Sequence, residues 1–368
     1  MGMFLPFLSV YFRQDLGFSG RQIGILSLIQ PLLMMLVAIP AASLADHRRW
    51  RVSLLQVGIL GAAIMLIVAM FPRSFLLWIG CRSLMALFAG PTMPLADSII
   101  ARMALTHRLN YGSMRLWGSL SFAVMAAGCG LVWEQVGLRP MLPLTGLALL
   151  LVIIWASLLE EGPPRNPDAP KIGMRHILQN DMGLTVLTMT SFLIGASVYM
   201  SVVFDGIYMT HLGGTQSMIG FMFGLTAFSE PPTMHYSQAL IRRFGGPQIL
   251  LIACLLMVTA FVGYSLAWEP WMLLLTAAVK GLGFGLFWAG NVRLTSERSP
   301  EHLTSTVQSI VTTAAFGVAP IIVSPISGEL FDAFGPRSIF FATTACTGGA
   351  ALILIIALAR GVFRRDAD

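Results

Sequence analysis

Six charged residues interrupt long apolar stretches of this sequence, and they are the groups best placed to do chemistry. Three are basic and three are acidic: Arg82, Arg115, Lys280, Asp97, Asp205 and Glu230. A charge within a hydrocarbon layer costs roughly 2.5 kcal/mol or more, so such residues face the protein interior, pair, and mark pathways. A balanced set favours alternating closure around a central cavity, and plain structural pairing is the alternative.

Asp97 and Arg115 flank one short basic loop. If one helix ends near Met103 and the next begins near Asn110, the two charged residues lie about 9 and 8 Å from the loop, at 1.5 Å rise per residue. Neighbouring antiparallel helices then bring carboxylate and guanidinium together. We expect this pair to line a substrate path, with a structural ion pair as the alternative.

Glu230 is followed directly by Pro231 and Pro232. Proline removes a backbone donor and disfavours helix for the residue before it. A break at membrane depth is tolerated where the chain faces protein or a wet cavity. The pattern predicts a broken helix whose carboxyl exchanges a proton, or a kink whose carboxyl is simply hydrogen-bonded.

The composition predicts a membrane protein with many spans. The 368 residues are 56% hydrophobic and 11% charged, whereas soluble domains carry roughly 25% charged residues. The net charge of +6 resides mostly in short loops, which argues against nucleic-acid binding. The four cysteines fall in apolar runs, which argues against a disulfide framework. The sequence contains no cluster of cysteines and histidines that would indicate a metal site. It also contains no phosphate-binding loop that would indicate ATP-driven transport. We expect no cofactor.

Apolar runs of about 20 residues predict the spans. Five full runs occupy the first half: Gln22–Ala45, Val52–Phe71, Phe75–Met103, Asn110–Trp133 and Met141–Leu159. Six occupy the second: Leu184–His211, Met218–Leu240, Pro247–Ala267, Trp271–Leu294, Leu303–Leu330 and Ile339–Val362. The proline-rich stretch 160–181 predicts a cytoplasmic linker between an N-terminal bundle (1–159) and a C-terminal bundle (182–368).

The first run, Met3–Phe12, is too short to span a membrane by itself. Ten helical residues rise about 15 Å, half of a roughly 30 Å hydrocarbon core. We expect the natural chain to begin about 10–15 residues upstream, the length missing from a roughly 20-residue span. Eleven full spans are the alternative.

Charge placement favours twelve spans with both termini in the cytoplasm. With that assignment, fifteen of the 23 Lys and Arg residues lie in cytoplasmic segments, and five lie opposite: Arg13, Arg21, Arg73, Arg139 and Arg337. Cytoplasmic loops carry an excess of positive charge. Location in a cell inner membrane follows as an expectation.

Three stretches resemble the major facilitator superfamily, in the branch of lactose permease, nucleoside–proton symporters and phenylpropionate permease. They are Phe4–Leu8 through Gln22–Gly24, Tyr111–Gly118 and Val203–Asp205, in the family's order along nearly the whole chain. The resemblance implies two six-helix bundles with a midplane site between them.

The resemblance also implies roles for single residues. Asp97 and Arg115 match an acid and an arginine that contact the sugar in lactose permease, and Asp205 matches an aspartate that pairs with a lysine on the tenth helix. Lys280 lies one turn beyond that lysine's position, where the sugar transporter has its proton-coupling histidine, and the partner glutamate is replaced by Gly283. The loop Asp46, Arg48 and Arg49 matches a gating motif that lacks its usual glycines here, with Ala42 and Trp50 at those positions.

These observations predict a secondary transporter, not an enzyme, that takes up a small organic solute together with protons and acts as a monomer. Asp97, Arg115, Lys280 and Arg82 are the expected substrate-binding residues, and Glu230 and Asp205 the expected proton-coupling residues. Since Lys280 and Arg82 share one acid at their depth, we expect an organic anion such as an aromatic carboxylate. A neutral sugar or nucleoside, an efflux pump of the same fold and a non-transporting membrane sensor are the alternatives.

Overall fold

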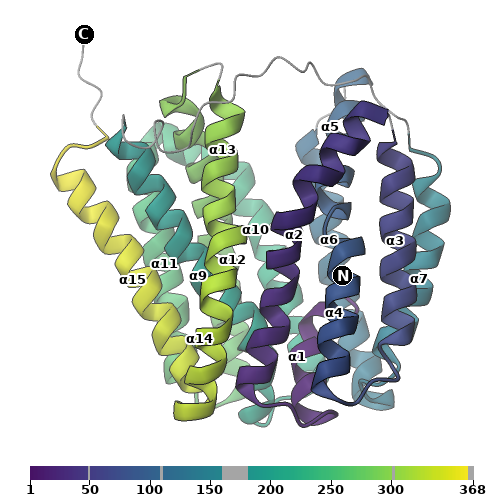
Figure 1. Ribbon diagram of the computed structural model, residues 1–368. Helices are drawn as coiled ribbons and strands as arrows, with labels where there is room; N and C mark the ends of the chain where they lie inside the picture. The colour runs from purple at the N-terminus through teal and green to yellow at the C-terminus, as the bar shows by residue number, and fades with distance from the viewer. Residues whose placement is uncertain (49, 108–110, 160–180, 301–302, 364–368) are drawn as a thin grey trace.

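The computed structural model describes residues 1–48, 50–107, 111–159, 181–300 and 303–363, and these residues are helical with short turns between the helices. The first six crossings lie on one side and the last six on the other (Figure 1). The twelve-helix, all-α fold expected from the sequence is confirmed. Within the described residues, nine helices are long and apolar enough to cross a membrane. The other three crossings are short (α1 and α7) or less apolar (α10).

The first half contains six crossings built from seven helices. Their bounds are α1 Leu5–Gln14, α2 Gly20–Arg48, α3 Arg51–Val68, α4 Phe75–Ala89, α5 Thr92–Thr106, α6 Tyr111–Val136 and α7 Met141–Ala156. The span expected over Phe75–Met103 is present as Phe75–Ile100, but it divides into α4 and α5 around Gly90 and Pro91. Proline lacks the backbone N–H that would continue the hydrogen-bond ladder.

The second half also contains six crossings. Their bounds are α9 Met182–His211, α10 Gln216–Phe244, α11 Gly246–Leu266, α12 Pro270–Arg298, α13 Thr304–Thr313, η2 Ala314–Val318, α14 Ala319–Phe334 and α15 Arg337–Ala359. The eleventh crossing therefore contains a π-helical turn, η2, between α13 and α14. Of the expected linker 160–181, only Asp181 lies in the described residues, where its carboxylate caps α9 and pairs with Arg298 at 2.9 Å.

The two halves pack together at the end of the molecule opposite the end of α7 and the start of α9, which we call the sealed end (lower in Figure 1). Here α2 packs along α14, and α6 along α10. A Cβ atom at Gly24 of α2 would overlap the carbonyl oxygen of Ser324, and one at Gly220 of α10 would overlap that of Ala126. Glycine is thus required at both contacts, because backbone carbonyls cannot rotate away as side chains can.

Two carboxylates at the sealed end also cap helices of the opposite half. The side chain of Asp332, at the end of α14, accepts hydrogen bonds from the first N–H groups of α2, Gly20 at 2.7 Å and Arg21 at 2.8 Å. Glu134, near the end of α6, accepts from the N–H of Ser217 at the start of α10, at 3.1 Å. Carboxylates at helix N-termini accept hydrogen bonds from the unpaired N–H groups and interact favourably with the positive end of the helix dipole. Each half therefore caps a helix of the other.

We expect Asp332→Asn to loosen the sealed end. A carboxylate at an exposed helix N-terminus contributes roughly 0.3–1 kcal/mol, so opening is expected to become about two- to fivefold more populated. The measurement is maleimide labelling of a cysteine placed at Val10, which is fully buried on α1, in a background without the native cysteines. Asp15→Asn is the matched control, since Asp15 pairs with Arg139 within one half; equal labelling in both variants would contradict the capping role.

Candidate functional site

A small cavity of about 170 Å³ lies between the two halves. Leu5 of α1 and Phe122 of α6 line it from the first half. The other lining residues come from α9, α10 and α12 of the second half: Val198, Val202, Phe223, Thr226, Ala227, Glu230, Lys280 and Phe284. Its walls are therefore mainly apolar and aromatic, with one carboxylate and one ammonium group.

Helical spacing explains why these residues share one cavity. On α10, Phe223, Ala227 and Glu230 follow one another at four and three residues, which places them on one helix face. The pairs Val198 and Val202 on α9, and Lys280 and Phe284 on α12, have the same four-residue spacing. Each helix thus turns one stripe toward the cavity.

Lys280 forms a buried ion pair with Asp205. Its Nζ lies 2.6 Å from Oδ2 of Asp205, and the two side chains are 7% and 1% exposed. Ser201 bridges the pair, donating to Oδ1 of Asp205 at 2.7 Å while its Oγ accepts from Nζ at 3.1 Å. The Nζ also lies 5.1 Å from the centre of the Tyr264 ring. The charge of Lys280 is therefore largely neutralised by the protein.

We expect removal of one partner of this pair to destabilise the protein strongly, and replacement of both partners to destabilise it little. Removing one partner of a buried pair costs about 3–5 kcal/mol, whereas replacing both by apolar groups is often neutral. Asp205→Asn and Lys280→Met should each lower the melting temperature sharply, and the double variant should recover most of it. Arg293→Ala, at the exposed Arg293–Glu297 contact, is the surface control. Additive losses in the double variant would show that the two groups do not depend on each other.

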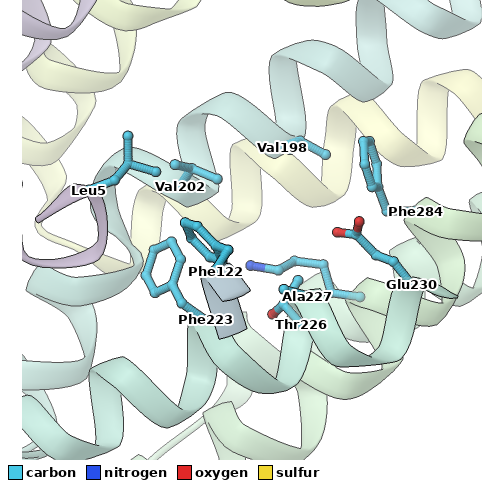
Figure 2. A pocket seen from close by; sticks show the side chains of 10 residues that line it. Leu5, Phe122, Val198, Val202, Phe223, Thr226, Ala227, Glu230 and Phe284 are labelled. Atoms are coloured by element: carbon cyan, nitrogen blue, oxygen red, sulfur yellow. The ribbon is translucent and has the colours of Figure 1, made fainter. Parts of the chain in front are cut away.

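Glu230 points its carboxylate into the cavity (Figure 2). The expected break at this position is wrong, because α10 runs without interruption from Gln216 to Phe244 through Pro231 and Pro232. The prolines still deprive the carbonyls of Ala227 and Phe228 of their usual helical donors. Such defects are tolerated in membrane helices where neighbouring groups or water supply hydrogen bonds. The carboxylate thus lies on a locally weakened turn at the cavity wall.

Arg82 lies apart from Lys280 and is not among the cavity-lining residues. It is 6% exposed on α4, donates to Oε1 of Gln30 at 3.1 Å, and its Nε has no hydrogen-bond partner within the described residues. The shared acid expected from the sequence, Asp205, is instead occupied by Lys280. A buried guanidinium therefore remains without a carboxylate partner in the part of the chain that the structure describes.

The remaining predicted site residues are not brought into this cavity. Asp97 is half-buried on α5 and does not line it. The side chains of Asp46, Arg48 and Arg115, and all of Arg49, lie outside the described residues. The pairing of Asp97 with Arg115 and the gating role of the loop stay predictions.

Sequence reasoning missed the aromatic wall. Phe284 on α12 is followed one turn later by Trp288, and both contact Phe316 of η2, with ring centres 6.4 and 5.1 Å from its ring. Because α12 runs away from the sealed end, this wall continues from the cavity toward the opposite end of the molecule. Aromatic residues in apolar helices normally pack against neighbouring side chains or lipid, so nothing in the sequence separated these from the others.

A hydrogen bond across the two halves was also missed. The hydroxyl of Tyr199 on α9 donates to the carbonyl oxygen of Ser27 on α2 at 2.6 Å. Pro31 lies four residues after Ser27 and has no N–H to offer that carbonyl. A proline inside a predicted span marks an acceptor four residues earlier, so this signal was present in the sequence.

Comparisons with known proteins agree with this architecture. The chain is 26% identical to maltose permease of Geobacillus stearothermophilus over 356 residues, covering 96% of this chain and 90% of that protein. It is 25% identical to a probable 3-phenylpropionic acid transporter of Escherichia coli strain K12 over 347 residues, covering 91% and 88%.

Solved structures show the same fold. The crystal structure of the nucleoside transporter NupG superposes with a TM-score of 0.81 at 15% identity, covering 99% of this chain and 96% of that one. A bacterial homologue of the human lysosomal transporter Spinster, in an inward-facing and occupied conformation, gives 0.66 at 17% identity, covering 97% and 91%. A model of the MFS_1-like family matches residues 1–342. With its six crossings on each side of a central cavity, this chain belongs to the MFS_1-like family of major facilitator transporters.

Proposed function

We propose that this secondary transporter takes up a small organic solute together with protons, by alternating access of one cavity to the two sides of the membrane. The observation that carries the proposal is the cavity between the halves, which places the carboxylate of Glu230 beside aromatic and apolar walls. A carboxylate there can hold a proton while a solute occupies the same space. Residues 1–159 and 182–368 are the two bodies that move, and residues 160–181 connect them.

The favoured solute is an organic anion with a flat apolar part, such as an aromatic carboxylate. Three phenylalanines in the cavity wall suit a ring, and Arg82 carries a buried positive charge that the described carboxylates do not neutralise. The name of the Escherichia coli relative, a probable 3-phenylpropionic acid transporter, points the same way. We place the protein in a bacterial inner membrane, as a monomer with both termini in the cytoplasm.

A neutral sugar or nucleoside is the second candidate. It is favoured by the relative named maltose permease and by the fold shared with a nucleoside transporter. The pairing of Lys280 with Asp205 also removes one of the two positive charges that pointed to an anion.

A thermal-shift screen of purified protein against sugars, nucleosides and aromatic acids separates these classes. Uptake of the radiolabelled ligand into cells, with and without a proton uncoupler, then tests direction and coupling. The proposal expects stabilisation by an aromatic acid and uptake that the uncoupler abolishes. Uptake that is indifferent to the uncoupler, or cells that retain less solute when they express the protein, would contradict it.

A further inference from the structure

Arg82 is a cation that the described protein leaves without an anion. It lies within the membrane-spanning stretch Phe75–Ile100 and is 94% buried, being 6% exposed. A guanidinium carries five N–H donors. Its one hydrogen bond within the described residues goes to a neutral group, Oε1 of Gln30 at 3.1 Å, and its Nε–H donates to nothing there. Buried charges are normally paired, so this position is suited to an anion.

Asp205, the acid expected to pair with Arg82, pairs with Lys280 instead. Both carboxylate oxygens of Asp205 are occupied, Oδ2 by Lys280 at 2.6 Å and Oδ1 by Ser201 at 2.7 Å, and the side chain is 1% exposed. The charges of Lys280 and Asp205 therefore cancel each other. Of the two bases and one acid that were expected at this depth, only Arg82 keeps an unneutralised charge.

The guanidinium also lies where the two halves meet. Gln30 belongs to α2, whereas Tyr199, which lies within electrostatic range of Arg82, belongs to α9 of the other half. The Tyr199 hydroxyl is held by its bond to Ser27. Its neighbours on α9, Val198 and Val202, line the cavity. The Arg82 site and the cavity thus share α9 as a wall.

We propose that Arg82 binds the carboxylate of the transported solute and that Gln30 positions the guanidinium of Arg82. A guanidinium offers a planar pair of donors that matches a carboxylate, and this match is lost in an amide of the same shape. The Gln30 amide oxygen fixes one terminal nitrogen and leaves the Nε edge of the fork unoccupied. The substrate carboxylate then pairs with the guanidinium at each cycle. This inference rests on the proposed transport function and names its substrate class.

The test compares two acids with their neutral amides on the purified full-length protein. The probes are 3-phenylpropionate with 3-phenylpropionamide, and benzoate with benzamide, measured by calorimetry or thermal shift. Wild-type protein is expected to bind at least one acid about tenfold or more tightly than its amide. Arg82→Gln should remove that preference by weakening acid binding while leaving amide binding unchanged, and Arg82→Lys should retain part of it.

Gln30→Glu keeps the test decisive if Arg82→Gln does not fold. This substitution places a carboxylate beside the guanidinium, so it should preserve folding and still abolish the preference for the acid. Gln30→Ala should reduce the preference several-fold, and Gln30→Asn should restore part of it. A folded Arg82→Gln or Gln30→Glu protein that retains the wild-type preference would overturn the proposal, as would wild-type protein that prefers neither acid.

A separate uptake assay tests the transport proposal independently of Arg82. Proteoliposomes with an imposed pH gradient are supplied with maltose and uridine as neutral probes. Gradient-driven uptake of either, with no preference for the acids in binding, would leave proton-coupled transport standing and remove Arg82 as the anion site.

Discussion

Replacing Gly24 and Gly220 together with tryptophan is expected to reduce transport to background. Any Cβ at these positions overlaps a backbone carbonyl of the opposite half, of Ser324 or of Ala126. The indole ring is far larger than a methyl group, and the facing helix cannot yield without separating the halves. The sealed end should therefore stay open, which stops alternating access while leaving the folded bundles intact.

Transport assays and cysteine labelling together measure this effect. The double variant should show almost no uptake but strong maleimide labelling of a cysteine at Val10, which is fully buried in the sealed state. Gly128→Trp is the matched control on α6, since a Cβ there meets nothing within 4 Å. Normal transport by the double variant would show that the sealed end is not a moving gate.

Glu230→Gln is expected to abolish accumulation of solute against its gradient. Glutamine has nearly the shape of glutamic acid but carries no exchangeable carboxyl proton, so the link between solute and proton is lost. Binding, and exchange of labelled for unlabelled solute, should remain because neither needs net proton movement. Solute therefore only equilibrates down its own electrochemical gradient and is no longer accumulated by the proton gradient.

Accumulation and counterflow in the same vesicles distinguish loss of coupling from loss of folding. Glu297→Gln is the control, because Glu297 is an exposed carboxylate that pairs with Arg293 of its own helix, α12, at 2.6 Å. The control should accumulate solute as wild type does. Full accumulation by Glu230→Gln would remove Glu230 from the coupling mechanism.

The spans could be predicted because the length and hydropathy of each apolar run decide whether it crosses the membrane, almost independently of the other runs. The loop-separated runs gave twelve crossings, and the observed helices differ mainly at their ends. Divisions within a crossing were harder to predict. The division at Gly90 and Pro91 was not predicted, although both residues disfavour a continuous helix. The π-helical turn η2, which contacts α2 and α9, has no recognisable sequence pattern.

The site was predicted in parts. The residues of the Lys280–Asp205 pair stood out because charges are rare in apolar runs, but the sequence could not decide whether Asp205 serves Lys280 or Arg82. That choice depends on how α9, α12 and α4 are placed in space. Similarly, Pro231 and Pro232 predicted a break that is absent, because α10 continues through both prolines while it packs against α6 and α12.

Proton movement coupled to solute entry tests the account most directly. Purified protein is reconstituted into proteoliposomes that contain a pH-sensitive dye, and the solute identified by the thermal-shift screen is added outside. The account predicts internal acidification that follows solute entry and is absent in Glu230→Gln. Solute entry without any internal pH change in the wild-type protein would contradict it.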